Sequence, residues 1–233
     1  DAPRVTYHGL GEDFPSRVQV LIDGHSQYSP LFLGGVNWNL IPVALENIER
    51  IEVLRGSNSV AYGANAFLGV INIITQKAAQ TPGGNIALNR GDGGINDTFA
   101  RWGGKAPGAD FRLSYREQAD TGLDKHFDSR RNRLFNLRAD LYLNSRDELE
   151  LNLSHVDNAL GSGNVIKPCD PAHNYRMASN ALQARWRRAL GPEEEIRVNY
   201  SLVQEGSGDR HFETCNAQLF NVDYGGRSDR KST

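Results

Sequence analysis

The 233-residue chain carries 26 lysines and arginines and 28 aspartates and glutamates, which gives a formal net charge of −2. Because the two signs are balanced, the composition gives no electrostatic reason to expect a nucleic-acid partner. The mean hydropathy is −0.53, and no apolar run approaches the roughly 20 residues that a membrane helix needs. These features exclude a helical membrane protein. They do not exclude a β-barrel, whose strands alternate lipid-facing and lumen-facing residues.

The first third of the chain combines short strands with short helix signals. In chain order, the predicted elements are a buried strand at 18–22, an Asp-Gly turn at 23–24, a short helix at 41–48, a strand at 49–54, a helical turn at 59–63 and a strand at 69–75. Each of these elements is common in proteins that mix helices and strands. Their order and spacing are the more specific feature.

The composition changes near Lys77, after which the chain becomes polar and rich in Gly, Asn and Arg. The segment 78–84, which contains a Pro-Gly-Gly turn, is the natural linker. We therefore predict two domains, at residues 1–80 and 81–233. The first residues lack the charged and apolar regions of a signal peptide, so we expect that such a peptide was removed or that the chain begins inside a longer protein.

From Asn85 onward, apolar and polar residues alternate with a period of two, which predicts strands with one apolar face. The predicted strands are two weaker ones at 85–90 and 96–104, five clear ones at 111–116, 135–144, 148–154, 182–187 and 196–202, and an eighth that starts near Gln218. Soluble sandwiches also alternate in this way, so the period alone does not distinguish a sandwich from a membrane barrel.

The connections between these strands favour the barrel. After a first connection at 91–95, short ones at 105–109, 145–146 and 191–193 alternate with long ones at 121–131, 158–174 and 206–217. Outer-membrane barrels have brief periplasmic turns and extended extracellular loops. Trp102 and Trp186 both fall near predicted periplasmic strand ends, where an interfacial aromatic girdle would lie, although each could equally cover a sheet edge.

Three segments of the first domain resemble the closing part of the plug domain of TonB-dependent outer-membrane receptors. They are Ile48-Glu-Arg-Ile-Glu-Val-Leu-Arg-Gly56, Ala61-Tyr-Gly-Ala-Asn-Ala66 and Gly69-Val-Ile-Asn-Ile-Ile-Thr75, and Val20-Leu-Ile-Asp-Gly24 precedes them where the family has a strand and an Asp-Gly turn. The similarity runs from Arg17 to Gln76. It departs at Ser57, where the family usually has Pro, and the TonB box and first plug strands are not found in this sequence.

The resemblance implies an α+β plug domain, lacking its N-terminal part, at 1–80, followed at 81–233 by about seven or eight antiparallel transmembrane β-barrel strands. A plugged barrel of this kind has roughly 22 strands, so these strands would form an incomplete barrel. The resemblance also implies energy-coupled uptake of a metal chelate across the outer membrane of a Gram-negative bacterium. An iron–siderophore complex is the first candidate, and cobalamin or another nutrient of the same receptor family is the alternative.

The expected partners are the TonB energy-transducing complex, a small metal chelate and outer-membrane lipid, with no nucleic acid and no cofactor. Two other classes stay open: a passive porin-like barrel, which would lack the plug, and a soluble all-β binding module. An enzyme is not expected, because the sequence has no phosphate-binding Gly-Lys-Ser/Thr loop, no His-Glu-x-x-His and no Gly-x-Ser-x-Gly elbow.

The resemblance suggests roles for a few residues. Glu52 and Arg55 would form a latch between plug and barrel through charge-assisted hydrogen bonds, the alternative being solvent-facing charges on a soluble domain. Five residues belong to plug regions that face the extracellular side in the family and are candidates for ligand contact: Tyr28, Trp38, Asn39, Tyr62 and Asn65. Aromatic and amide groups suit a bulky chelate, but aromatic residues of these segments could equally pack the plug core.

The two cysteines, Cys169 and Cys215, fall in neighbouring predicted extracellular loops. On an oxidising cell surface this placement predicts a disulfide. A metal site with His173 or His211 is the alternative, but it lacks close ligand spacing, so no metal site is expected.

Overall fold

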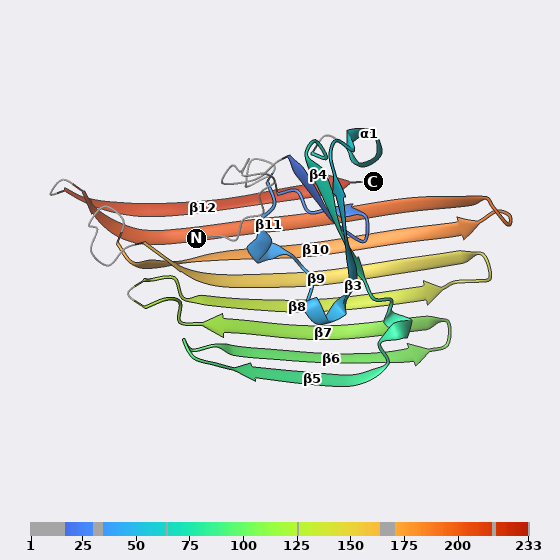
Figure 1. Cartoon of the computed structure of the whole chain (residues 1–233), viewed down its shortest axis with the longest axis horizontal. Coiled ribbons are helices and arrows are strands. Elements are labelled where there is room, and N and C mark those ends of the chain that lie inside the picture. The colour runs from blue at the N-terminus through green and yellow to red at the C-terminus, as the bar shows by residue number, and fades with distance from the viewer. Residues whose placement is uncertain are drawn as a thin grey trace.

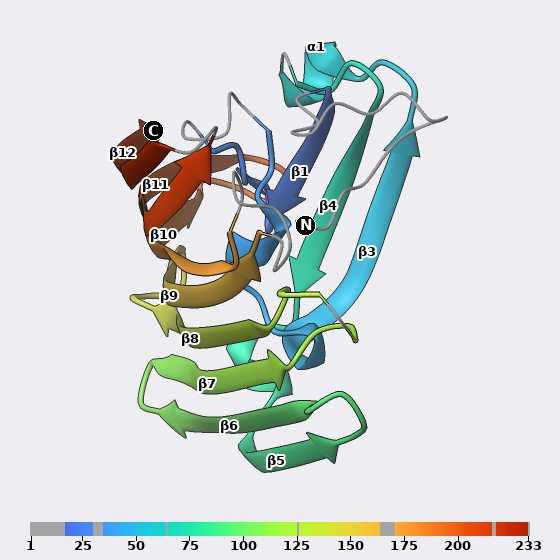
Figure 2. The same cartoon turned by 90° about the vertical axis from the view of Figure 1, so that its left-hand side faces the viewer.

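The computed structural model describes residues 17–29, 35–63, 65–124, 126–163, 171–215 and 218–232, with the side chains described up to residue 209. These residues form two β-sheets (Figure 1). The small sheet has four strands in the order β2-β1-β4-β3, and the large sheet has eight in the order β12-β11-β10-β9-β8-β7-β6-β5. Figure 2 shows the large sheet nearly end-on as a curved wall, with the strands of the small sheet beside it.

The small sheet contains the three strands predicted in the first third of the chain and a short fourth one, β2, that was not predicted. Its strands are β1 (Val18–Ile22), β2 (His25–Ser26), β3 (Ile48–Arg55) and β4 (Gly69–Thr75). Strand β4 pairs in parallel with β1 and antiparallel with β3. The run Val20–Ile22 is buried, as expected for a short apolar strand between two neighbours.

The helical segments are short. They are η2 (Trp38–Leu40), η3 (Leu45–Asn47), α1 (Ser59–Tyr62) and η4 (Ala78–Gln80). The α1 turn confirms the helical turn predicted at 59–63, but the helix predicted at 41–48 is wrong. Residues 41–44 are not helical, and Ala44 is fully buried against the large sheet. A helix of two turns is too short to be stable on its own, so this packing decides its conformation.

The predicted linker at 78–84 is not an open loop. Residues Ala78–Gln80 form η4, and β5 begins at Gly83. Ala78 is buried, and its backbone N–H donates to the Asp140 carboxylate at 2.8 Å. The connection between the sheets is therefore held against the wall.

The large sheet is a meander in which each strand pairs with the next, antiparallel throughout. Its strands are β5 (Gly83–Arg90), β6 (Asn96–Ala106), β7 (Ala109–Asp120), β8 (Arg130–Tyr142), β9 (Asp147–Ser162), β10 (His173–Ala189), β11 (Glu195–Cys215) and β12 (Gln218–Ser232). The predicted alternation and the eighth strand are confirmed.

The long loop predicted at 206–217 is wrong. Strand β11 continues to Cys215, and only residues 216 and 217 separate it from β12. Gly206, Ser207 and Gly208 gave the segment the composition of a loop, yet they pair with β10 on one side and β12 on the other. Hydrogen bonds to two neighbouring strands override the weak strand propensity of such residues. The connections at 121–129 and 163–172 and the C-terminal part of β11 lie at the same end of the large sheet. This end therefore extends through long strands as well as through longer connections.

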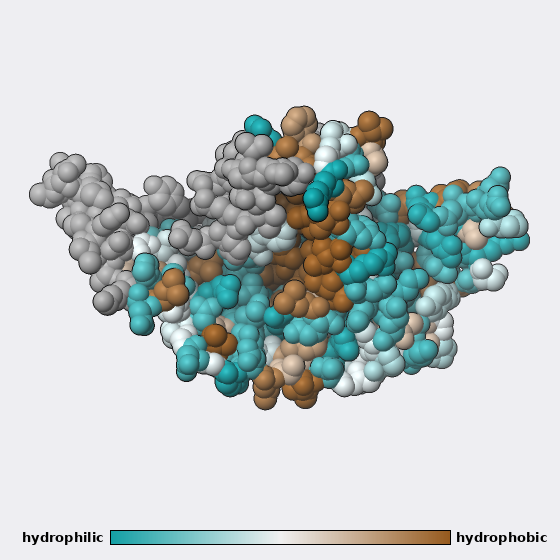
Figure 3. Space-filling model, in the orientation of Figure 1, coloured by the Kyte–Doolittle hydropathy of each residue, from teal (hydrophilic) through white to brown (hydrophobic). Residues whose placement is uncertain are grey.

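The two faces of the large sheet differ in polarity. The face toward the small sheet, called here the inner face, carries buried polar residues such as Arg112, Ser114, Asn136, Arg138 and Asp140. The opposite, outer face exposes apolar ones such as Leu113, Phe135 and Leu153. Figure 3 views the inner side, where apolar residues gather over the small sheet and hydrophilic residues cover much of the large sheet around it. Across the described part of the chain, no helix is long and apolar enough to cross a membrane.

Candidate functional site

The small sheet and its connections dock on the inner face of the wall, and this interface is the candidate functional site. Its apolar part is a cluster in which Leu40 and Ala44 meet side chains from four strands of the large sheet, β6, β8, β9 and β10. The buried members are Leu40, Ala44, Phe99, Leu134, Val156, Leu160 and Met177. Burial of these side chains from both sides fixes the segment 40–44 on the wall.

A network of buried charges surrounds the turn after β1. The backbone of Asp23 has a φ of 49°, in the left-handed region that Asp adopts more readily than most residues. Its carboxylate accepts a hydrogen bond from the Thr75 backbone N–H at 2.9 Å and another from the Thr75 hydroxyl at 2.6 Å. The turn therefore clamps the end of β4 to the end of β1.

Arg138 of β8 links this turn to the wall. Its side chain is 6% exposed, donates to the Thr75 hydroxyl at 2.9 Å and lies 3.5 Å from the Asp23 carboxylate. On the wall it pairs with Asp140 at 2.9 Å and with Glu150 at 3.5 Å. Each buried charge thus faces a partner of opposite sign, which offsets the cost of removing the charges from water.

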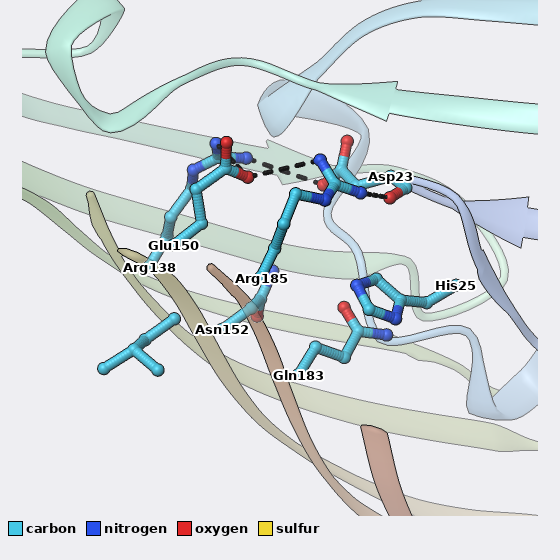
Figure 4. A pocket seen from close by; sticks show the side chains of 8 residues that line it. Asp23, His25, Arg138, Glu150, Asn152, Gln183 and Arg185 are labelled. Atoms are coloured by element: carbon cyan, nitrogen blue, oxygen red, sulfur yellow. Dashed lines mark hydrogen bonds and ion pairs between the residues drawn. The ribbon is translucent and has the colours of Figure 1, made fainter. Parts of the chain in front are cut away.

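Arg185 of β10 reaches the same turn from the other side. Its guanidinium donates to the Asp23 backbone carbonyl and lies 3.4 Å from the Glu150 carboxylate. Figure 4 shows Arg138 and Arg185 converging on Asp23 and Glu150, with His25, Asn152 and Gln183 nearby. The cavity between them holds only about 20 Å³, too little for a chelate, so the cluster is a docking contact and not a ligand site.

More arginines hold the segment 46–76. Arg112, 1% exposed, donates to the Gln76 carbonyl at 2.7 Å. Arg101 donates to the Glu46 carbonyl at 3.1 Å, and Arg116 pairs with the Glu46 carboxylate at 3.1 Å. Charge-assisted hydrogen bonds are roughly twice as strong as neutral ones. The guanidinium groups of the large sheet therefore contribute most to holding the small sheet and its connections in place.

Contacts to side-chain amides and a carboxylate lie nearer the end of the longer connections. The Asn39 carbonyl accepts hydrogen bonds from the side chains of Asn132 and Asn158. Ser29 donates to Glu205, which lies on β11. The docking contacts therefore run from Arg138, toward the end of the tight turns, to Asn158, toward the end of the longer connections.

A hollow of about 640 Å³ opens beside Asn39 at the end of the longer connections. Its lining includes four aspartates and one arginine, together with Tyr175 and Leu160. Arg130 pairs with Asp120 at 3.0 Å, and the Asp128 carboxylate accepts the Leu123 backbone N–H at 2.9 Å. The hollow is large enough for a small chelate.

The five predicted ligand residues are not brought to one place. Asn39 lines the hollow, whereas Tyr28 lies in a small cavity with Asn37, Leu40 and Glu205. Trp38 packs with Val20 and Ile73 on one face of the small sheet, and Tyr62 packs with Leu21 and Val70 on the other. Asn65 lies in the turn after α1 and is partly buried. Their role in binding stays a prediction.

The predicted latch residues lie on β3, the strand of the small sheet farthest from the wall (Figure 2). Glu52 accepts hydrogen bonds from Arg50 at 2.8 Å and Asn72 at 3.1 Å, both within the small sheet. These two bonds, the one from Arg50 more than the one from Asn72, lower the pKa of the Glu52 carboxyl below its usual value. Arg55 is exposed at the end of β3. The latch also stays a prediction.

The predicted disulfide lies outside the described residues, because Cys169 falls in the segment 164–170 and the Cys215 side chain is not described. Sequence reasoning missed the docking residues Asp23, Arg138 and Arg185. The Asp-Gly turn and the polar inward positions were visible signals, but neither reveals which charges pair across the interface.

A family model for the TonB-dependent receptor plug domain matches residues 1–70. The chain is 39% identical over 94 residues to an iron-regulated outer membrane virulence protein of Vibrio cholerae, covering 38% of this chain and 14% of that protein. It is 43% identical over 76 residues to the vitamin B12 transporter BtuB of Photobacterium profundum, covering 33% and 12%. With the ferric enterobactin receptor of Pseudomonas aeruginosa the identity is 30% over 174 residues, covering 75% and 20%.

Solved structures share the fold. The ferric yersiniabactin uptake receptor of Yersinia pestis superposes with a TM-score of 0.71 at 17% identity, over 94% of this chain and 36% of that one. The ferripyoverdine receptor of Pseudomonas aeruginosa gives 0.70 at 13% identity, over 91% and 32%. The chain thus spans about a seventh of the length of the first curated relatives and about a third of these structures.

Proposed function

The chain belongs to the TonB-dependent receptor family, and from that premise we propose that it is the plug and first wall strands of a receptor that imports a metal chelate by energy coupling. The protein lies in the outer membrane, as its relatives do. The observation that carries the proposal is the docking of the small sheet on the polar inner face, where Arg138 and Arg112 grip Asp23, Thr75 and Gln76.

In this proposal residues 1–80 are the plug and residues 81–233 are the first part of the barrel. The plug blocks the lumen while its docking contacts hold. A chelate can pass only if part of the plug moves away from the wall, and force from the TonB energy-transducing complex would supply the work. Contacts made by long arginine side chains suit such movement, because a guanidinium can follow a displaced carbonyl over a few ångströms.

We favour an iron–siderophore complex as cargo. The matched proteins include an iron-regulated protein, a ferric enterobactin receptor and several siderophore receptors of known structure. The hollow beside Asn39 is the proposed first contact for the chelate, with Tyr28, Trp38, Tyr62 and Asn65 as further candidates. Cobalamin is the second candidate, because vitamin B12 transporters match residues of this chain at 38–43% identity.

Uptake by cells that express the full-length receptor tests this function. We expect accumulation of ⁵⁵Fe-siderophore to stop when a protonophore collapses the proton-motive force, because a plugged receptor needs energy to open. Uptake that persists without that force would indicate a passive pore. ⁵⁷Co-cobalamin, measured in the same cells, distinguishes the two cargoes.

The latch is tested separately. If Glu52 and Arg55 hold the plug to wall strands beyond this chain, Arg55→Ala in the full-length receptor should change uptake and increase hydrogen exchange in β3. Lys77→Ala, which removes an exposed charge outside β3, is the control. Unchanged uptake and unchanged exchange in Arg55→Ala would rule the latch out.

A further inference from the structure

The outer face of the wall carries a level row of leucines. Cross-strand pairing aligns one leucine from each of five adjacent strands: Leu113, Leu137, Leu153, Leu182 and Leu202. Leu113 and Leu153 are 37% and 44% exposed although they are large and apolar. A continuous apolar band of this kind is what the lipid-facing side of a membrane barrel requires.

The apolar band ends abruptly along β8. Outward residues of β8 are apolar at every second position from Phe135 to Leu141, and the next two outward residues toward the longer connections are Arg133 and Arg131. The eight residues from Phe135 to the end of β8 span roughly 27 Å at about 3.4 Å each, close to the length of about 9–11 residues that a tilted strand needs to cross a membrane. The two arginines therefore lie just beyond the hydrocarbon, at the level of the lipid headgroups.

The end of the wall that carries these arginines faces outward from the cell. Its connections include the longer ones at 121–129 and 163–172, whereas the opposite end has turns of two to five residues at 107–108, 143–146 and 190–194. Outer-membrane barrels place their short turns in the periplasm and their longer hairpins outside. Arg131 and Arg133 thus lie at the outer leaflet.

The charges at this level are not balanced. Arg131 and Arg133 lie 3.5 and 3.4 Å from the same carboxylate, that of Glu117. Asp157, the cross-strand partner of Arg133, is a second acid on this face, so with Arg176 three arginines face two acids. Their side chains are still 57% and 45% exposed. Arg176, also exposed, lies two strands away in the same row as Arg131, with Ala159 between them.

Aromatic rings lie directly beneath these charges. Tyr115 and Phe135 are cross-strand partners in the row between the arginines and the leucines, and both are exposed. The Tyr115 hydroxyl donates to Glu117 at 2.8 Å. An aromatic residue at this level can cover the sugar or the upper acyl chain of a lipid while the arginines contact its headgroup.

We propose that Arg131 and Arg133, supported by Arg176, bind the phosphate group of a phosphorylated glycolipid of the outer leaflet. Arginine suits this ligand because its planar guanidinium can donate two parallel hydrogen bonds to a phosphate. The phosphate competes with Glu117 for the two arginines. The proposal rests on the outer-membrane placement of the wall, but not on the identity of the cargo.

The experiment uses the full-length receptor in detergent and titrates it with lipid A, a bis-phosphorylated glycolipid, or with its dephosphorylated form, detecting bound lipid by native mass spectrometry. We expect lipid A to bind about tenfold more tightly than the dephosphorylated lipid. The double variant Arg131→Ala/Arg133→Ala should lose most of this preference. Arg146→Ala, an exposed arginine in a turn at the opposite end, should keep it.

A second variant keeps the test decisive if the double variant fails to fold. Glu117→Gln removes the competing carboxylate, so binding of lipid A should become tighter while binding of the dephosphorylated lipid stays the same. Equal binding of both lipids by the wild type, or an unchanged preference in the double variant, would overturn the proposal. Loss of energy-dependent uptake with normal lipid preference would instead count against the proposed function.

Discussion

Arg131, Arg133 and Arg138 belong to the same strand, β8, but project from opposite faces of the wall. On the inner face, the Arg138 side chain is 6% exposed and contacts Asp23, Asp140, Glu150 and Thr75. On the outer face, Arg131 and Arg133 share one carboxylate and remain about half exposed. Arginine therefore has two different roles on the two faces. On the inner face it is buried among its partners, and on the outer face it is half exposed, where we propose that it binds a phosphate. Burial sets how strongly a charge depends on its partners.

The largest effect expected from this comparison is at Arg138. Arg138→Met keeps the aliphatic volume but leaves three carboxylates, Asp23, Asp140 and Glu150, without their shared cation. Breaking a buried charge network in this way costs about 3–5 kcal/mol. Hydrogen exchange of the backbone N–H groups in β4 of the full-length receptor measures the loss as faster opening of the docked plug.

Arg133→Met on the outer face is the matched control. Exposed ion pairs contribute about 0–1 kcal/mol, so exchange in β4 should hardly change. Equal effects of the two variants would mean that burial does not distinguish the two faces.

The next largest effect is expected in the apolar part of the interface. Leu134, 3% exposed, packs with Leu40 and Phe99, and Leu134→Ala should cost about 2–4 kcal/mol because it leaves a cavity under the plug. Leu153→Ala, on the outer face and 44% exposed, should cost much less. Thermal unfolding in detergent, followed by hydrogen exchange at residues 39–44, separates the two variants. A larger loss for Leu153→Ala would mean that the docked segment contributes little to the stability of the wall.

The strands could be predicted from the sequence because their signals are local. Strands β1 and β4 have the predicted bounds, 18–22 and 69–75, since each is a short apolar run between turn-forming residues. The prediction of a loop at 206–217 failed for the opposite reason. Its Gly and Ser residues carry a weak local signal, and pairing with β10 and β12 decides its conformation.

The docking site was only half predictable. Alternation shows that Arg112, Arg138 and Arg185 face the polar side of their strands. It does not show that Arg138 meets Asp23, because those residues are far apart in the chain and their meeting depends on how the small sheet is placed on the wall. The prediction that the ligand residues lie together fails for the same reason. Trp38 and Tyr62 lie on segments of similar chemistry but pack on opposite faces of the small sheet.

A smaller effect is expected where the backbone of the linker approaches the wall. A Cβ atom on Gly103 would lie 2.0 Å from the Thr81 carbonyl oxygen, so Gly103→Ala must displace the linker. Such overpacking costs about 1–3 kcal/mol. Gly84→Ala is the control because its Cβ would meet no atom within 4 Å. Protease sensitivity of the segment 77–83 reports the displacement, and equal sensitivity in both variants would contradict it.

The smallest effect is expected at Glu52. Its exposed ion pair on the small sheet contrasts with the buried charge network at Arg138. Hydrogen bonds from Arg50 and then Asn72 lower the Glu52 pKa, so the folded protein favours the carboxylate. The stabilisation is complete above the ordinary carboxyl pKa of about 4.3 and disappears as the pH falls through the lower folded value. The stability difference between wild type and Glu52→Gln should therefore be present at neutral pH and vanish in acid. It should also shrink in 1 M salt, which screens exposed charges, whereas the effect of Arg138→Met should persist. A Glu52 contribution that survives both acid and salt would show that the rest of the receptor buries this edge of the plug.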